Sequence, residues 1–233
     1  MINQIEAILF DLDDTIFDRT LAQNEAISAI LRMFPDLLGS IDENVARDAF
    51  FEADRLAIHI ESQGSTLAEV LTLRSRTFLN LLGLSIDRAQ EITEAYTKNY
   101  REISTPVNGS MSVLRVLNGL FPLGLVSNGY PDVQHTKIDS LKIRPFFEFT
   151  LISEEIGIRK PDPEIFLRAA QMLGVEPPKC LFVGDSYQND IFGAKRAGMQ
   201  ACWLNRDGAL IEGATIPDLE VSKMEMLIQA LVD

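Results

Sequence analysis

The chain has few cysteines, no long apolar segment and no excess of basic residues. Its two cysteines, Cys180 and Cys202, do not have the C-x-x-C spacing of a zinc or redox site. Both lie beside apolar runs typical of buried strands, which favours reduced core thiols. No run approaches the roughly 18–20 apolar residues of a membrane span, and the start of the chain lacks the pattern of a signal peptide. We therefore expect a cytoplasmic protein that does not bind membranes.

Acidic residues outnumber basic ones by 34 to 21, which gives a formal net charge of −13. An acidic surface disfavours binding to nucleic acid and to anionic membranes. The hydrophobic fraction of 46% and the charged fraction of 24% are ordinary for a soluble globular protein. A length of 233 residues suits one large domain or a core with a small second domain. The sequence leaves open whether the protein is a monomer or a homodimer.

A strand-like run from Ile5 to Asp11 is followed by a segment, 19–103, that reads as almost pure helix. Apolar residues recur at helical spacing from Ala26 to Phe34. Further helices are predicted over Val45–Ser62, Thr66–Leu82 and Asp87–Arg101. Breaks are predicted at Pro35–Gly39, Gln63–Ser65 and Gly83. Four amphipathic helices with short connections indicate an antiparallel bundle.

From Leu120 onward the pattern alternates between strands and helices. Strands are predicted over Pro122–Ser127, Phe149–Ser153, Lys179–Gly184 and Met199–Leu204. Helices are predicted up to Leu141 and over Asp162–Gly174, Asn189–Ala197 and Ser222–Val232. Such alternation predicts an α/β protein with a Rossmann-like, doubly wound parallel sheet. We expect residues 1–18 and 104–233 to form this core, with residues 19–103 inserted as a helical bundle.

Two carboxylates follow the first predicted strand, in the segment Asp11-Leu12-Asp13-Asp14-Thr15. Side chains alternate along an extended chain, so Asp11 and Asp13 can point to the same side. One can then stay ionised as nucleophile and metal ligand, while the other carries a proton for a leaving group. Taken alone, an acidic segment of this kind is more often a solvated turn.

Two later segments supply groups that suit phosphate. The hydroxyl of Ser127 and the backbone N–H groups near Asn128 lie in a turn after a predicted strand, where they can bind phosphate oxygens. Lys160 precedes a predicted helix in a segment stiffened by prolines. From there it can reach both a phosphoryl group and the carboxylate of Asp11.

A fourth segment adds carboxylates, because Asp185 follows a strand and Asp190 opens a helix. Mg²⁺ prefers carboxylate oxygens, and Asp11 with Asp185 is a suitable pair of ligands. Parallel sheets place their sites at the carboxyl ends of strands. The four segments together therefore predict one magnesium-dependent phosphate site.

In this order, the segments resemble the four motifs of the haloacid dehalogenase (HAD) superfamily of phosphohydrolases. The matching residues are D-x-D-x-T at 11–15, Ser127, Lys160, and G-D-x-x-x-x-D at Gly184–Asp190. The helical insertion resembles the type 1 cap of that family. The segments S-N-G, I-S-E-E-I-G-I-R-K-P-D-P and A-C-W-L-N are similar to pyrimidine 5′-nucleotidases and sugar-phosphate phosphatases that carry this cap.

The resemblance implies a role for each matching residue. Asp11 would form an aspartyl-phosphate, and Asp13 would protonate the leaving alcohol and then activate water. The Asp13 carbonyl would ligate Mg²⁺ with the carboxylates of Asp11 and Asp185, supported by Asp190. The phosphoryl oxygens would be held by Ser127 and Lys160, helped by backbone amides near Leu12, Asp13 and Asn128.

Three other activities compete with phosphate ester hydrolysis. Dehalogenases of the family lack the second acidic residue of the first motif, and Asp13 is present here. A phosphomutase would share every motif. A catalytically silent phosphate-binding protein would be expected to have lost Asp11 or Asp13, and both are intact.

The expected substrate is a small phosphorylated metabolite, either a nucleoside monophosphate or a sugar phosphate. The inserted helices would close over the site and select the leaving group. Several residues are candidates for contact with the substrate, although a structural role is preferred for each. They are Phe17, Arg19, the loop Phe34–Ser40, Arg55, His59 and Tyr100.

Overall fold

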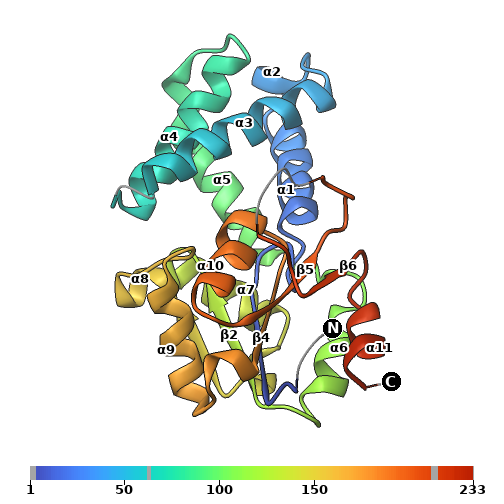
Figure 1. The fold of residues 1–233 in the computed structure, drawn as a ribbon. Coiled ribbons are helices and arrows are strands. Elements are labelled where there is room, and N and C mark those ends of the chain that lie inside the picture. Colours follow the sequence, from blue (N-terminus) through green and yellow to red (C-terminus); the bar gives the residue numbers. More distant parts are fainter. Residues whose placement is uncertain (1–3, 62–63, 211–214, 233) are drawn as a thin grey trace. The chain divides into compact units, whose positions relative to one another are not determined.

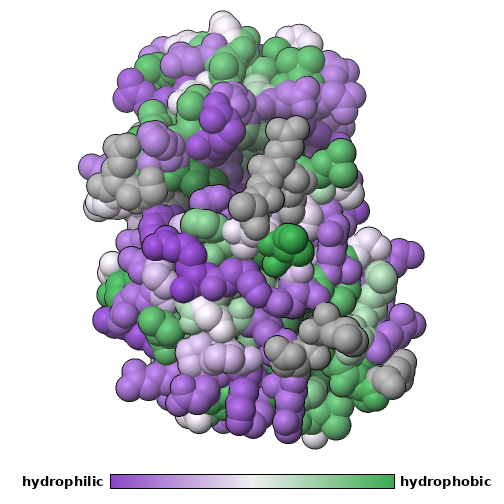
Figure 2. Space-filling model, in the orientation of Figure 1, coloured by the Kyte–Doolittle hydropathy of each residue, from purple (hydrophilic) through white to green (hydrophobic). Residues whose placement is uncertain are grey.

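The computed structural model describes residues 4–61, 64–210 and 215–232 (Figure 1). Contacts divide the chain into two compact units, one formed by Met1–Arg19 with Ser104–Asp233 and the other by Thr20–Ile103. The predicted helix end at Ser62 and the break at Gln63 lie outside the described residues. Hydrophilic residues cover much of the face drawn in Figure 2. Within the described ranges, no helix has both the length and the apolar character that crossing a membrane requires.

Among its described residues, the first unit contains a sheet of six strands in the order β3-β2-β1-β4-β5-β6. The strands are β1 (Ala7–Phe10), β2 (Leu123–Ser127), β3 (Phe149–Ile152), β4 (Cys180–Gly184), β5 (Gln200–Leu204) and β6 (Leu219–Val221). All neighbouring strands pair in parallel. This confirms the predicted Rossmann-like α/β core.

The central strand β1 is paired on both edges. Ile8 lies opposite Leu123 of β2 and opposite Leu181 of β4. Every residue of β1, β2 and β4 is buried, which explains why these strands read as continuous apolar runs. Because the three strands run parallel and adjacent, the residues that follow them meet at one edge of the sheet.

Helices cover both faces of the sheet. They are α6 (Ser110–Leu117), α7 (Pro131–Ser140), α8 (Ser153–Ile156), α9 (Pro163–Leu173), α10 (Phe192–Arg196) and α11 (Met226–Val232). In Figure 1, α9 and α10 lie on one face and α6 and α11 on the other. Phe166 of α9 packs edge-on against Phe182 of β4, with ring centroids 4.8 Å apart. Strand and helix are thus joined by the apolar face that each presents.

The second unit is helical. Its helices are α1 (Arg19–Met33), α2 (Pro35–Leu38), α3 (Glu43–Glu61), α4 (Leu67–Leu81) and α5 (Ala89–Glu102), with a short 3₁₀ turn at Ile86–Arg88. The ring of Phe50 stacks on Tyr96 at 4.7 Å and meets Phe78 edge-on at 5.7 Å. The predicted break at Pro35–Gly39 contains the single turn α2, whose Leu38 is buried.

The end of the chain differs from prediction in two places. The predicted helix Asn189–Ala197 begins instead as a π-helical turn, Tyr187–Ile191, before α10. Such wide turns are frequent at functional sites. The last helix begins at Met226 rather than Ser222, after a turn that follows the unpredicted strand β6, which pairs with β5. Three residues are too few to give a clear strand pattern.

Candidate functional site

Asp11 directly follows β1 at the carboxyl edge of the sheet. Its backbone N–H donates to the carbonyl of Val183 at 2.9 Å, which extends the pairing of β1 with β4 by one residue. The side chain is buried and forms an ion pair with the ammonium of Lys160. Burial raises the pKa of Asp11 to about 7, against the opposing effect of Lys160 and with a further rise from Asp190.

Lys160 links two of the carboxylates. Its Nζ pairs with Asp11, lies 2.7 Å from Asp190 Oδ1 and donates to the carbonyl of Val126 at 3.1 Å. Burial opposes its charge, but Asp11 and Asp190 outweigh that cost and raise the Lys160 pKa. The Asn128 side chain fixes the Lys160 backbone, accepting from its N–H at 2.8 Å and donating to its carbonyl at 2.9 Å. Because the Asn128 side chain is occupied in this way, only its backbone N–H would bind phosphate.

Asp185 and Asp190 are held by the turn after β4. Trp203 Nε1 donates to the Asp185 carbonyl at 2.7 Å, and the Ser186 N–H donates to Asp190 Oδ2 at 3.0 Å. A side chain at Gly184 would collide with the Asp190 carboxylate, so glycine permits this close approach. Burial, followed by the charges of Asp190 and Asp11, raises the pKa of Asp185 to about 9.

Asp11, Asp185 and Asp190 can each offer a carboxylate oxygen such that these atoms lie within 4.8 Å of one another. The raised pKa values of Asp11 and Asp185 have a common cause, because negative charge is gathered in a buried place with one ammonium nearby. A divalent cation bound by these oxygens would remove that conflict. An all-oxygen set of ligands suits a hard cation such as Mg²⁺. The residues present therefore fit a magnesium ion.

Asp13 has different partners, although it lies only two residues beyond Asp11. Lys137 Nζ donates to Asp13 Oδ1 at 2.7 Å and to Oδ2 at 2.8 Å. Gln134 Nε2 donates to the same Oδ2 at 3.0 Å. Burial opposes ionisation, but the charges of Lys137 and Arg19 outweigh it, so the pKa of Asp13 is lowered.

Ser127 ends β2 and is buried beside α7, the helix that carries Gln134 and Lys137. Its hydroxyl accepts from Gln134 Nε2 at 2.6 Å, and its geometry toward the Asn128 carbonyl, at 3.4 Å, is that of a weak donor. Gln134 and Lys137 were not predicted as site residues. The sequence does contain a sign of their burial, because both lie on the same helical stripe as the apolar residues Ile138 and Leu141. Both side chains are buried in the structure.

Of the residues proposed to recognise substrate, Phe17 is fully buried in the first unit. Arg19 acts on Asp13 through its charge. In the second unit, Arg55 is exposed and paired with Glu52, and His59 is exposed. Tyr100 stacks on Tyr96 with ring centroids 5.5 Å apart. The packing of Phe17 and Tyr100 agrees with the structural explanation preferred for these two side chains.

The helical unit contains a buried ion pair that the sequence analysis did not identify. Arg74 Nη1 donates to Asp54 Oδ1 at 3.2 Å, and Gln23 Nε2 donates to Asp54 Oδ2 at 3.1 Å. The guanidinium carbon lies 4.2 Å from the centroid of the Tyr96 ring, within the range of a cation–π contact. The pair therefore joins α3 to α4 inside the bundle.

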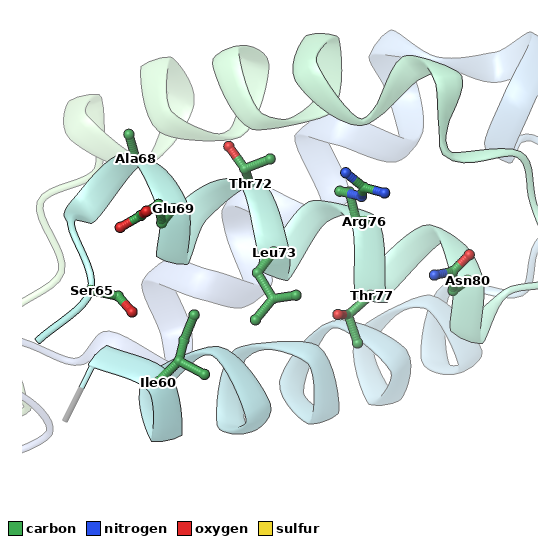
Figure 3. A pocket seen from close by; sticks show the side chains of 9 residues that line it. All are labelled: Ile60, Ser65, Ala68, Glu69, Thr72, Leu73, Arg76, Thr77 and Asn80. Atoms are coloured by element: carbon green, nitrogen blue, oxygen red, sulfur yellow. The ribbon is translucent and has the colours of Figure 1, made fainter. Parts of the chain in front are cut away.

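A groove of about 710 Å³ lies along α3 and α4 (Figure 3). Ile60 and Leu73 supply apolar walls, and Arg76 and Asn80 supply polar groups. Glu69 also lines it, but its carboxylate accepts from the N–H and hydroxyl of Thr66 at the start of α4. All of the lining residues belong to the helical unit.

Comparison with proteins of known sequence gives relatives over nearly the full length. The chain is 27% identical to pyrimidine 5′-nucleotidase YjjG of Escherichia coli over 225 residues, covering 96% of both chains. It is 29% identical to a glyceraldehyde 3-phosphate phosphatase of Methanopyrus kandleri, covering 97% of both.

Solved structures give the same fold. The HAD-hydrolase YfnB of Bacillus subtilis, crystallised with magnesium, superposes with a TM-score of 0.83 at 26% identity, covering 99% of this chain and 100% of that one. A 2-haloacid dehalogenase of Pseudomonas syringae gives a TM-score of 0.67 at 27% identity, covering 98% of each chain. The sequence profile of haloacid dehalogenase-like hydrolases matches residues 5–198. The chain belongs to the haloacid dehalogenase-like hydrolase family.

Proposed function

We propose that this protein is a magnesium-dependent phosphatase that hydrolyses a small phosphate monoester with Asp11 as nucleophile. The observation that carries the proposal is the group formed by Asp11, Asp185 and Asp190 around Lys160. It gathers at one sheet edge a nucleophile, a set of oxygen ligands and a fixed positive charge. Phosphoryl transfer requires that arrangement, because charge on the transferred group must be neutralised in place.

In the proposed reaction, an Asp11 oxygen attacks phosphorus and the ester P–O bond breaks. Asp13 gives a proton to the departing alkoxide, which leaves as an alcohol. Water then attacks the phosphorus of the aspartyl-phosphate, Asp13 takes a proton from that water, and phosphate and the Asp11 carboxylate are released. Lys160 and Ser127 hold the phosphoryl oxygens during both steps.

Bound Mg²⁺ would supply positive charge that keeps Asp11 ionised and offsets its repulsion from an anionic ester. The carboxylates of Asp11 and Asp185 and the Asp13 carbonyl are the proposed ligands. Asp190 is proposed to support the site through Lys160, to which it is already paired. The magnesium-bound structure of YfnB supports this choice of ion.

We further propose that the helical unit, predicted as residues 19–103, is the cap that selects the leaving group. Relatives named as a nucleotidase and a glyceraldehyde phosphate phosphatase support a nucleoside monophosphate or a sugar phosphate as the substrate class. Both classes are phosphate monoesters of alcohols, so the proposed chemistry at Asp11 and Asp13 serves either.

Dehalogenation and phosphomutase activity are the competing reactions. The fold is shared with a 2-haloacid dehalogenase, but a dehalogenase of this family would not be expected to carry Asp13. A mutase would return the phosphoryl group to a second hydroxyl instead of releasing it. Each reaction gives a different product, so one assay separates them.

The test measures phosphate release from a panel of nucleoside monophosphates and sugar phosphates, with Mg²⁺ and with EDTA. Halide release from a 2-haloacid and isomerisation of the sugar phosphates are measured in parallel. We expect metal-dependent phosphate release that Asp11→Asn abolishes. Halide release or isomerisation without phosphate would refute the proposal, and so would phosphate release that EDTA leaves unchanged.

A further inference from the structure

Helix α7 supplies two side chains that hold the carboxylate of Asp13. Lys137 reaches both oxygens, at 2.7 and 2.8 Å, and Gln134 reaches Oδ2 at 3.0 Å. The two donors are three residues apart and so project from the same face of the helix. Both are almost fully buried, at 5% and 1% exposed. These contacts restrict Asp13 far more than water would.

Gln134 also ties Asp13 to the turn after β2. Its Nε2 lies 2.6 Å from Ser127 Oγ and 3.0 Å from the Asn128 carbonyl. A Cβ at Gly129 would lie only 3.2 Å from Gln134 Cδ, so glycine leaves room for the amide. One side chain therefore spans the loop that carries the proposed acid and the loop proposed to bind phosphate.

We propose that Lys137 and Gln134 are positioning residues that place the Asp13 carboxylate for proton transfer. This inference rests on the function proposed above, in which Asp13 serves the leaving alcohol. Proton transfer depends on placement within hydrogen-bond reach, and a displacement of about 1 Å can cost on the order of 100-fold in rate. A carboxylate gripped at both oxygens by one helix keeps its place relative to Ser127.

A purely structural role for Lys137 predicts something different. Its Nζ lies 5.5 Å from the centroid of the Phe17 ring, and its charge offsets that of a half-buried carboxylate. If that were its whole contribution, loss of the ammonium would lower stability and would affect all substrates alike. A positioning role affects only those esters whose leaving group needs a proton.

The experiment compares Lys137→Met with the wild type on an aryl and an alkyl phosphate. The aryl ester is p-nitrophenyl phosphate, whose phenolate leaves without a proton, and the alkyl ester is the best substrate of the panel. The quantity measured is kcat/KM, because it reports the steps up to departure of the leaving group. The control is Lys195→Met, which breaks a lysine–aspartate pair outside the site, with Asp218, in which the lysine is more exposed.

We expect Lys137→Met to lower kcat/KM for the alkyl ester by about 10–100-fold and for the aryl ester by less than about threefold. Lys195→Met should leave both values near those of the wild type. Equal losses on the two esters, or no loss on the alkyl ester, would overturn the inference. If Lys137→Met does not fold, Lys137→Gln, which keeps one donor, should show the same selectivity to a smaller extent.

A double-mutant cycle with Asp13→Asn tests whether Lys137 acts through Asp13. In the Asp13→Asn background, Lys137→Met should change the alkyl kcat/KM by less than about twofold. Losses that multiply would overturn the inference. Metal-dependent turnover by the wild type is measured alongside, so failure of the proposed function is seen separately as a wild type that hydrolyses neither ester.

Discussion

Replacing Asp185 by asparagine should make the metal-free protein more stable. Asp185 is half-buried, and burial together with Asp190 and Asp11 raises its pKa from 3.8 to about 9. A carboxyl group whose pKa is raised by folding binds its proton more tightly in the folded state. Its cost to stability is absent below pH 3.8 and grows as pH rises toward 9. Asparagine has no such cost at any pH.

The size of the effect follows from the pH interval. Each pH unit between the two pKa values costs at most about 1.4 kcal/mol, so raising the pH from 5 to 7 would cost at most about 3 kcal/mol. Solvent near the half-buried carboxyl reduces this. We therefore expect the advantage of Asp185→Asn over the wild type to grow by about 1–2 kcal/mol between pH 5 and pH 7.

Magnesium should narrow the difference in stability between the two proteins. A ligand at 100 times its Kd stabilises the folded state by about 2.7 kcal/mol. The wild type should gain this from Mg²⁺, and Asp185→Asn, which loses a proposed ligand and a charge, should gain less than half. The carboxylates therefore destabilise the empty site and stabilise the loaded one.

The assay is urea unfolding at pH 5 and pH 7, in EDTA and in Mg²⁺. Asp139→Asn is the matched control, because Asp139 is exposed and pairs with Arg144 at the surface; it should stay within about 0.5 kcal/mol of the wild type. An Asp185→Asn protein that is less stable than the wild type in EDTA would refute the reasoning about the carboxylate cluster. Equal stabilisation of both proteins by Mg²⁺ would refute the proposed ligand.

Three further substitutions test the site and the helical unit. Asp11→Asn should abolish turnover with an unchanged far-ultraviolet circular dichroism spectrum, because it removes the nucleophile and keeps the shape; residual turnover in protein free of wild type would contradict that role. Lys160→Met should lower the free energy of unfolding in EDTA by about 3–5 kcal/mol, because Asp11 and Asp190 lose their buried cation, and Mg²⁺ should restore part of the loss in urea unfolding. Arg74→Met should cost the helical unit a similar amount, about 3–5 kcal/mol, by leaving Asp54 buried without its cation, and Arg74→Met with Asp54→Leu should recover most of it; an unstable double variant would contradict this account.

The sheet was predictable because its central strands are buried on both sides. Strands such as β1 and β4 are short apolar runs that end at polar residues, and parallel order follows from the helices between them. The three-residue strand β6 was not predictable, since it lies at the sheet edge and only one of its residues is buried. The π-helical turn at Tyr187–Ile191 was missed for another reason, because no sequence pattern distinguishes it from an ordinary helix start.

The carboxylate cluster could be anticipated from its position after the strands, whereas the contacts of Asp13 could not. Asp11 and Asp185 follow adjacent strands, so the topology alone brings them together. Lys137 and Gln134 lie on a helix, and their contact with Asp13 depends on how α7 is rotated against the sheet. Buried polar residues on an apolar stripe indicate that a partner exists, but the sequence does not identify that partner.

Asp11 and Asp13, the two carboxylates of the first motif, have different charged partners and opposite pKa shifts. Asp11 shares Lys160 with Asp190, and its pKa is raised because burial and negative charge outweigh one ammonium. Asp13 has the ammonium of Lys137 on both oxygens, and its pKa is lowered. In the metal-free protein the proposed nucleophile is therefore the weaker acid, which is the reverse of what the reaction needs. Positive charge at the cluster lowers the pKa of Asp11, and an anionic ester beside Asp13 raises that of Asp13. The proposed roles thus require both the metal and the substrate, because the site without them favours the opposite protonation.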